Sequence, residues 1–409
     1  MPLPHPITCD CCGMNRRQFL HFGGLLAGSA GLALLGRGEP LQAATTALAG
    51  GQDQQVKIGY LPILDASPLL IADARGVFKA QGLSTTKPTR FRSWAQLSEA
   101  FLSRQVNVVH MLFPTTIWMR YSKAFPAKVV AWNHTNGSAL TVQDAIDKPQ
   151  DLGGKVVAIP FWYSIHNVVL QQLLRRNGLR VVRRPIEASL APNEVNLVVL
   201  PPAEMVPALA SKKIAGYIVA EPFNAAAESK KIGKVLRFTG DIWNDHACCV
   251  VLMHEDDVNK RPEWTQRVVN AIVASQRWMR SNRLEVAELL SEEGGRNYTP
   301  HSKAVLTRAL TAYGSPYLKD RAILHPEWRN QRIDFQPYPF ASYTKELVRL
   351  LKITQVEGDR AFLNSLSPDR VARDLVTERF VRKAIALNGG AAAFNLPANF
   401  SRQEQIVFT

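Results

Sequence analysis

Six short loops carry most of the side chains that could bind a small molecule. Each loop follows an apolar run that is typical of a buried strand. The loops lie at residues 64–67, 113–116, 133–137, 161–166, 221–224 and 243–246, and Ser93-Trp94 joins them at the start of a helix. Because loops after parallel strands meet beyond the carboxyl ends of those strands, we expect one shared ligand site.

The segment at residues 159–179 is the clearest of these candidates. Phe161-Trp162-Tyr163 forms an aromatic loop, Ser164 is placed to cap a helix, and an Asn-Gly pair supplies the helix end. His166 lies in the first helical turn, where free backbone N–H groups can bind an anion or a polar solute. We therefore predict that Tyr163 and His166 contact a ligand.

Other loops supply further candidates, and each candidate also has an ordinary structural interpretation. Trp94 can face the ligand or pack in the core beside a helix cap. Asn136 precedes Gly137, which is also common turn chemistry. Glu221 can face a ligand or accept backbone N–H bonds from the helix that follows it. The predicted ligand contacts in these loops are Trp94, Asn136, Glu221, Asn224 and His246.

Metal binding and catalysis find less support in the sequence. His246-Ala247-Cys248-Cys249 could bind a transition metal with Glu221 or His166, but its spacing matches no common zinc framework. In a regular strand His246 and Cys248 share a face and Cys249 points away. We therefore predict no metal site and no cofactor. The sequence holds no G-x-S-x-G, H-E-x-x-H or P-loop motif, so we also predict no catalytic residue and no enzymatic activity.

The N-terminus is typical of an export signal. Asn15-Arg16-Arg17-Gln18-Phe19-Leu20 is a twin-arginine pattern, the apolar run at 22–35 is short, and Ala47-Leu48-Ala49 offers a cleavage site. We interpret residues 1–49 as a Tat signal peptide, with a retained membrane anchor as the alternative. Translation can begin at Met1 or at Met14.

Composition indicates an ordinary globular protein with a basic surface. Of 409 residues, 46% are hydrophobic and 20% are charged, which allows a sizeable core and two lobes. The formal charge of +15 fits a solvated basic surface, anionic solutes or a membrane surface. Nucleic acid is not an expected partner, because there is no Lys/Arg-rich run with interleaved aromatic residues.

Strand and helix patterns alternate up to about residue 253, and helical patterns dominate after it. This order predicts an α/β protein with mostly parallel sheets. The last segment, residues 391–409, has no clear period over most of its length, and we interpret it as a C-terminal tail.

One family combines these features in the same order. The segment GYLPILDASPLLIADARGVFKAQGL, then Ser93-Trp94, AEPFNAAAE, and TGDIW with a later His, resembles periplasmic solute-binding proteins of the nitrate/sulfonate/bicarbonate/taurine type. The resemblance covers roughly residues 56–390. It implies a type II periplasmic-binding-protein fold, in which two α/β lobes and a two-strand hinge enclose a ligand cleft. Lobe one is then 56–140 plus 247–390, with the helices after 253 packed on it, and lobe two is 141–246.

The same resemblance implies a function and a set of roles. Such proteins close on a small solute and deliver it to the membrane permease and ATPase of an ABC importer, so we expect a periplasmic monomer. Trp94 resembles the tryptophan that faces the ligand in nitrate-type members, and Asn136 lies where that group carries an amide. Glu221 aligns with the acidic residue of an Asp/Glu-Pro element, His246 with a histidine after an Ile-Trp pair. Tyr163 or His166 falls near a ligand-contacting position.

The resemblance leaves the solute open. Apart from Arg92, no Lys or Arg lies in these loops to balance an oxyanion, and an acidic Glu221 in the cleft disfavours one. A neutral, amide-bearing or heteroaromatic solute is therefore retained beside nitrate or bicarbonate. The alternative functions are a thiamin-pyrimidine-synthase-like enzyme or a pyrimidine-precursor-binding protein on the same fold, and a sensor that regulates a membrane protein.

Overall fold

The computed structural model describes residues 55–408. The interpretations of residues 1–49 as a signal peptide and of Met14 as a start therefore lie outside the described residues. Within 55–408, no helix combines the length and the hydropathy that a bilayer crossing requires.

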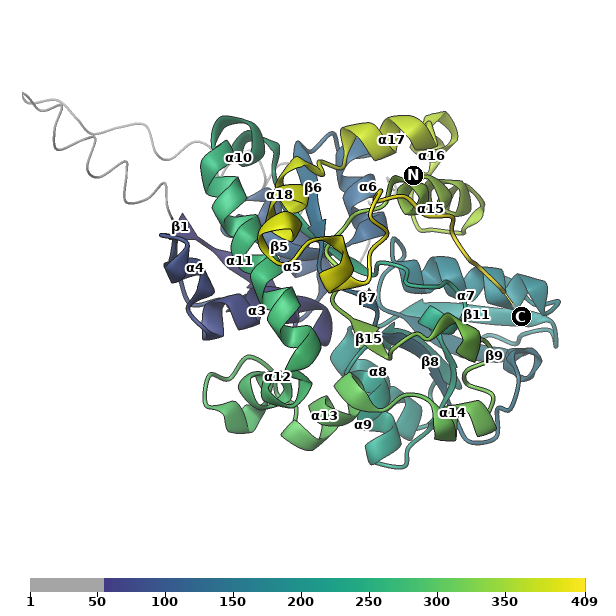
Figure 1. The fold of residues 1–409 in the computed structure, drawn as a ribbon. Coiled ribbons are helices and arrows are strands. Elements are labelled where there is room, and N and C mark those ends of the chain that lie inside the picture. Colours follow the sequence, from purple (N-terminus) through teal and green to yellow (C-terminus); the bar gives the residue numbers. More distant parts are fainter. Residues whose placement is uncertain (1–54, 409) are drawn as a thin grey trace, which may run out of the picture. The chain divides into compact units, whose positions relative to one another are not determined.

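Five strands form the sheet of the first lobe, in the order β4-β2-β5-β14-β6. Figure 1 labels β5 and β6 of this sheet. The parallel strands β4 (Thr89–Arg90), β2 (Ile58–Tyr60) and β5 (Val108–Leu112) are followed by β14 (Cys249–His254), which is antiparallel to both β5 and β6 (Ala127–Trp132). The first-lobe helices are α3 (Ser67–Ala74), α4 (Val77–Ala80), α5 (Trp94–Leu102) and α6 (Phe113–Tyr121), and β1 (Gln55–Val56) pairs separately with β3 (Ser84–Thr85).

Six strands form the sheet of the second lobe, in the order β10-β11-β9-β12-β8-β13. Four are parallel, namely β10 (Arg180–Val182), β11 (Glu194–Val199), β9 (Lys155–Ile159) and β12 (Gly216–Ala220). The antiparallel strand β8 (Ser138–Val142) lies between β12 and β13 (Lys234–Phe238) and belongs wholly to this sheet, so the expected boundary after residue 140 falls inside a strand. The helices of this lobe are α7 (Ile165–Arg176), α8 (Pro202–Ala210) and α9 (Phe223–Ser229).

Local signals explain how some of these helices begin. The Ser164 side chain accepts the Asn167 N–H at 3.0 Å, so the predicted cap of α7 is confirmed. Ser93 caps α5 in the same way through Gln96. Ser67, by contrast, is the first residue of α3 and not its cap, because the 3-10 turn η1 (Leu64–Ala66) leads directly into that helix.

Two chain crossings join the lobes. The first crossing, residues 133–137, contains β7 (Thr135–Asn136), and the second crossing, residues 239–248, begins with the 3-10 turn η3 (Thr239–Asp241). They run side by side, since Thr135 forms an antiparallel bridge with Ala247 and the Asn136 N–H donates to the His246 carbonyl at 2.9 Å. A third segment, β15 (Ile333–Asp334), pairs with β7 and reinforces this hinge.

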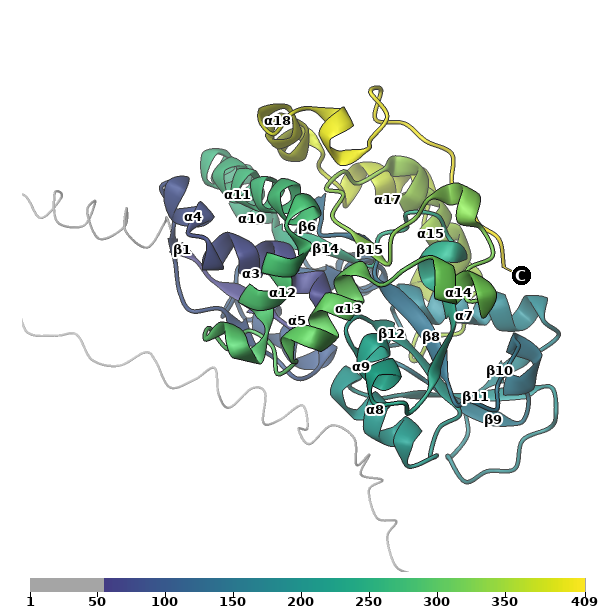
Figure 2. The same ribbon diagram turned by 60° about the horizontal axis from the view of Figure 1, so that its bottom comes forward.

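The C-terminal helices were expected to pack on the first lobe, but not all of them do so. Helix α11 (Pro262–Ser281) contacts α3 and α4, but α13 (Lys303–Thr311) contacts α9 of the second lobe (Figure 2). Tyr317, Ala322 and Ile323 bury Val235 and Phe238 on β13, the last strand of the second sheet, which gives this segment an apolar surface to cover. The remaining helices are α10 (Glu255–Lys260), α12 (Arg283–Leu290), α14 (Ser315–Lys319), α15 (Ala341–Ile353), α16 (Ala361–Ser365), α17 (Pro368–Asp374) and α18 (Arg379–Leu387).

The C-terminal tail is fastened to the second crossing. The Asn244 N–H donates to the Gln405 carbonyl at 2.9 Å, and Trp243 Nε1 donates to Glu404 Oε2 at 2.7 Å. Apolar side chains hold it as well, since Phe394 and Leu396 are buried and Phe400, Ile406 and Phe408 pack against the core at spacings that follow no regular repeat. The segment therefore shows no period in the sequence although it is held in place.

Candidate functional site

Seven buried groups gather where the two crossings meet the first sheet. They are the side chains of Asp65, His110, His134, His166, His246, Cys248 and Cys249, and we call them the central cluster. Asp65 lies in η1 after β2, and His110 lies in the middle of β5. His134 belongs to the first crossing, and His246 and Cys248 to the second, whereas His166 comes from the first turn of α7 in the second lobe. Both lobes therefore contribute to the cluster.

Asp65 and His134 form a buried ion pair, with 3.0 Å between Oδ2 and Nε2. Burial opposes the charge on Asp65, but His134 outweighs it and places the pKa of that carboxyl at about 2. Burial likewise opposes the charge on the imidazole, and Asp65 outweighs it and raises the pKa of His134 to about 10. Within residues 55–408, neither oxygen of Asp65 accepts a backbone N–H or a hydroxyl.

Cys248 and Cys249 are free thiols that both approach this pair. One ligand atom each of Asp65, His134, Cys248 and Cys249 lies within 4.8 Å of the other three. The expectation that the two cysteines point to opposite faces is therefore wrong. Its physical reason is that β14 begins only at Cys249, so Cys248 lies in a bend outside the regular alternation of the strand.

His166 and His246, two of the predicted contacts, are brought together at the edge of this group. His166 Nε2 lies 2.9 Å from Ser138 Oγ and 3.8 Å from Cys248 Sγ. His246 Nε2 lies 2.8 Å from Thr239 Oγ1, which itself donates to the Ser138 carbonyl at 3.0 Å. Thr239 must then accept from His246, so Nε2 carries the proton. Burial lowers the pKa of His246 to about 3 and keeps the ring neutral.

Trp94 borders the central cluster at His110, whereas Tyr163 contacts the first-lobe helix α6. The Trp94 ring lies 5.3 Å from that of His110, and its buried Nε1 has no hydrogen-bond partner among the described residues. Tyr163 reaches from the second lobe to α6, where its ring stacks on Trp118 at 5.8 Å and its carbonyl accepts from Thr115 Oγ1 at 2.7 Å. Both side chains are buried, which fits either a core residue or a ligand contact.

The side chains of Asn136 and Asn224 form hydrogen bonds with residues outside the central cluster. Asn136 has a φ of +58°, and its side-chain amide donates to Asp245 Oδ1 at 3.1 Å. Asn224 accepts from Thr141 Oγ1 at 2.8 Å and donates to the Val219 carbonyl at 2.9 Å. The structure therefore places Asn136 in the hinge and Asn224 inside the second lobe.

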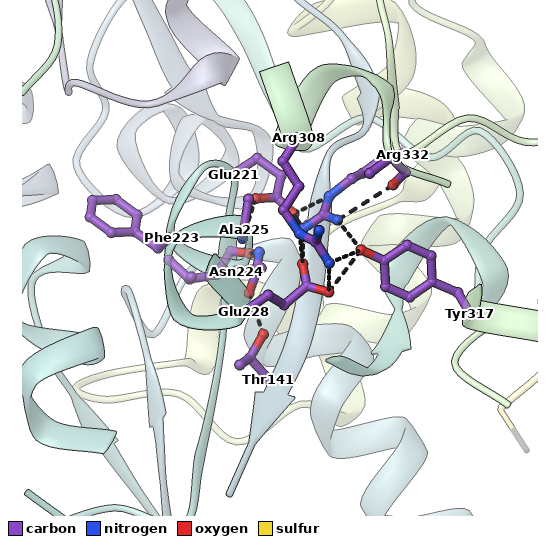
Figure 3. A network of polar contacts seen from close by, with 12 residues as sticks. Thr141, Glu221, Phe223, Asn224, Ala225, Glu228, Arg308, Tyr317 and Arg332 are labelled. Atoms are coloured by element: carbon purple, nitrogen blue, oxygen red, sulfur yellow. Dashed lines mark hydrogen bonds and ion pairs between the residues drawn. The ribbon is translucent and has the colours of Figure 1, made fainter. Parts of the chain in front are cut away.

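Glu221 belongs to a network of ion pairs (Figure 3). Its Oε1 lies 2.7 Å from Nη2 of Arg332, and that guanidinium also contacts Glu228 Oε2 at 2.8 Å. Arg308 contacts the other oxygen of Glu228 at 3.1 Å, and the Tyr317 hydroxyl lies 2.7 Å from that same oxygen. Two carboxylates thus face two guanidinium groups.

This network changes the expected electrostatics of the cleft. Burial raises the pKa of Glu221, and the charge of Arg332 opposes that rise. The sequence suggested that an acidic Glu221 disfavours an anionic ligand, but its carboxylate is paired with a cation that lies 111 residues later in the chain. That objection to an oxyanion is therefore wrong.

A groove of about 590 Å³ opens between the two lobes. Its walls come from the first lobe at Leu61, Pro62, Ile63, Arg90, Phe91 and Arg92, from the second lobe at Pro201, Pro202, Ala203, Glu204 and Phe223, and from Pro300. Arg90 and Arg92 thus line the same groove as residues 61–63, which lead into η1. Another hollow of about 440 Å³ lies between α11 and α18, where Glu263, Arg267 and Lys383 line it. None of the seven predicted contacts lines either hollow.

Known proteins resemble this chain in sequence and in fold. The profile of the NMT1-like family matches residues 49–291. The nitrate/nitrite binding protein NrtA of Nostoc sp. is 25% identical over 261 residues, which are 58% of this chain and 57% of that protein. The bicarbonate-binding protein CmpA of Synechococcus elongatus is 26% identical over 435 residues, or 97% of this chain and 94% of that protein. The chain thus spans little more than half the length of the first of these relatives.

Solved structures show the fold. The periplasmic nitrate-binding protein NrtA from Synechocystis PCC 6803 aligns with a TM-score of 0.71 and 18% identity, over 87% of this chain and 94% of that one. The alkanesulfonate-binding protein SsuA from Xanthomonas axonopodis pv. citri, bound to MOPS, aligns with a TM-score of 0.57 and 16% identity, over 76% and 96%. The predicted two-lobed periplasmic-binding-protein fold is confirmed.

Proposed function

The chain belongs to the NMT1-like family, and from this premise we propose that it is the solute-binding component of an ABC importer. It binds a small solute between its lobes, closes about the two crossings, and presents the closed form to a permease and an ATPase. It acts as a monomer in the periplasm after export by the Tat pathway. Its relatives include the nitrate import ATP-binding protein NrtC of Synechocystis sp., which supports an ATPase of that class as partner.

We infer that the solute is a small oxyanion of the nitrate, bicarbonate or sulfonate class. The names of the relatives support this class, as do three features of the chain. Arg90 and Arg92 line the groove between the lobes. The charge of Glu221 is balanced by Arg332. A formal charge of +15 favours the approach of anions.

The observation that carries the proposal is the set of buried polar atoms around the central cluster. Trp94 Nε1, Thr135 Oγ1 and His166 Nδ1 are all buried without a hydrogen-bond partner in the described part of the chain. Such atoms are rare in folded proteins and each one costs free energy unless something binds it. An oxyanion accepts hydrogen bonds from indole N–H and hydroxyl groups, so a bound solute of this class satisfies Trp94 Nε1 and Thr135 Oγ1.

The alternative of a pyrimidine-synthase-like enzyme receives no comparable support. The relatives named above are binding proteins and an importer ATPase. Solute binding by lobe closure needs no covalent step, so we assign no catalytic residue.

A thermal-shift panel tests the proposal. Nitrate, nitrite, bicarbonate, taurine and a hydroxymethylpyrimidine are each added to the full chain, with chloride at equal ionic strength as control. A solute at 100-fold excess over its Kd stabilises the folded state by about 2.7 kcal/mol, so one oxyanion should raise the melting temperature. A shift with the pyrimidine alone overturns the oxyanion class but not the binding function. The absence of any shift counts against both.

A further inference from the structure

We propose that Asp65, His134, Cys248 and Cys249 bind one thiophilic metal ion of the zinc type at the hinge. The four ligand atoms lie within 4.8 Å of one another, and all four side chains are fully buried. The proposal goes beyond solute binding and does not depend on it, since metal content can be measured with no solute present.

The donor set matches the chemistry of zinc. One carboxylate oxygen, one imidazole nitrogen and two thiolate sulfurs are all ordinary zinc ligands, and two sulfurs select against hard ions such as Ca²⁺ and Mg²⁺. A tetrahedral site with metal–ligand bonds of about 2.0–2.3 Å places its ligand atoms roughly 3.3–3.8 Å apart. Asp65 Oδ2 and His134 Nε2, 3.0 Å apart, lie slightly closer than this spacing and would have to separate by a few tenths of an ångström. No two of the four ligand atoms are more than 4.8 Å apart, so a contraction of about 1 Å at most brings the wider pairs to the upper end of the tetrahedral spacing.

The hydrogen bonding around His134 also points to a cation. Its Nε2 faces Asp65 Oδ2 at 3.0 Å and the Cys249 backbone N–H at 3.3 Å. One nitrogen cannot donate a proton to the carboxylate and accept one from the amide at the same time. A metal ion held by both Nε2 and Oδ2 replaces the proton between these two atoms, and the Cys249 N–H then no longer has Nε2 as an acceptor. The support for a cation here is therefore the close approach of Nε2 and Oδ2.

The position of the site suggests what the ion does. Asp65 comes from η1, His134 and Cys248 come from the two crossings, and Cys249 is the first residue of β14, so one ion joins η1 to both crossings where the lobes hinge. His166 of the second lobe lies 3.8 Å from Cys248 Sγ, close enough to donate a hydrogen bond to a metal-bound thiolate. The ion therefore stabilises the floor of the cleft and contacts the second lobe through an outer-shell histidine.

Zinc content and affinity test the site directly. The test uses the full chain with Cys9, Cys11 and Cys12 changed to Ser, because those N-terminal thiols could bind zinc by themselves. After dialysis against metal-free buffer and addition of zinc, elemental analysis should find one zinc per chain. Competition with a chelating dye should show that Cys248→Ser and Cys249→Ser each weaken zinc binding by about 10-fold or more. His325→Gln, which changes a histidine outside the cluster, should bind zinc as the parent does.

Cobalt supplies a second, spectroscopic measurement. Cobalt(II) in the parent should give the thiolate charge-transfer and intense d–d bands of a tetrahedral site, and both should be lost in the Cys248→Ser/Cys249→Ser double variant. Circular dichroism with excess chelator shows whether each variant folds, and Asp65→Asn offers a near-isosteric variant if a serine variant does not. Less than stoichiometric zinc in the parent, or equal zinc affinity in parent and folded variants, overturns the proposal.

Discussion

The guanidinium of Arg332 lies 2.7 Å from the carboxylate of Glu221, and both side chains are completely buried. Arg332 comes from the C-terminal segment, whereas Glu221 directly follows β12, a strand inside the sheet of the second lobe. Because Arg332 directly precedes β15, which pairs with the first crossing, the ion pair fastens the second lobe to the hinge. Stability and lobe movement are thus linked at one contact.

Removal of the Arg332 charge should destabilise the protein strongly. Arg332→Met leaves the carboxylates of Glu221 and Glu228 buried without their shared cation. Loss of one partner of a buried pair typically costs about 3–5 kcal/mol. Urea unfolding should show a loss of this size in the free energy of unfolding.

A matched control exists in the same network. Arg308 also contacts Glu228, but 42% of its side chain is exposed, so Arg308→Met should cost only about 0–1 kcal/mol. Equal losses in the two variants would contradict the view that burial decides the strength of this contact.

Local features were predictable from the sequence, and long-range contacts were not. The Ser164 cap depends on residues three positions apart, and it was predicted correctly. His166 and His246 were predicted as contacts, and both lie in the central cluster, because loops after strands converge in this class of fold. Arg332 was missed because it comes from the helical part of the chain, and nothing in its local sequence indicates a partner in the second lobe.

The grouping of Cys248 with Cys249 was missed for a different reason. The prediction treated Ala247 and Cys248 as part of a regular strand, whereas β14 starts at Cys249. An error of two residues at a strand end is ordinary, but here it changes which way a side chain points. The candidate loop 64–67 contained Asp65, yet only the fold brings it to His134.

Trp94 should contribute to solute affinity through its indole N–H. Trp94→Phe keeps an aromatic ring beside His110 but removes the unpartnered Nε1 donor. A hydrogen bond to a charged acceptor is worth about 1.5–3 kcal/mol, so the Kd for the oxyanion should rise roughly 10- to 100-fold by calorimetry. Trp264→Phe removes a similarly unpartnered indole N–H in α11 and should leave the Kd unchanged. Equal effects would show that Trp94 is only a core residue.

His301 should make the protein less stable in mild acid. Burial lowers the pKa of His301 to about 4, below the ordinary value of 6.5, while its ring packs edge-on against Phe223. The unfolded chain therefore binds the proton first, and the contribution of neutral His301 is complete above pH 6.5 and lost as the pH falls toward 4. Titration of this one group changes the free energy of unfolding by at most about 1.4 kcal/mol per pH unit.

Urea unfolding at pH 7 and pH 5 measures this effect. Other buried histidines also titrate, so the informative quantity is the difference between parent and variant. His301→Gln should lose less stability than the parent between the two pH values, and His325→Gln should lose as much as the parent. If the free energy of unfolding falls equally in all three proteins between pH 7 and pH 5, protonation of His301 does not cause the predicted loss of stability.

Glu404 should hold the C-terminal tail against the second crossing. Its Oε2 accepts the Trp243 Nε1–H at 2.7 Å, and its Oε1 accepts from Ser342 Oγ at 2.8 Å. Glu404→Ala leaves the buried indole donor without this partner and also breaks the ion pair with Arg402 at 2.9 Å, so the free energy of unfolding should fall by at least about 1–3 kcal/mol. Backbone amides of Asn244 and Val407, which pair across the same contact, should exchange with deuterium faster. Glu346→Ala breaks only an exposed pair with Arg349 and should change neither quantity. Unchanged exchange in Glu404→Ala would mean that backbone pairing alone holds the tail.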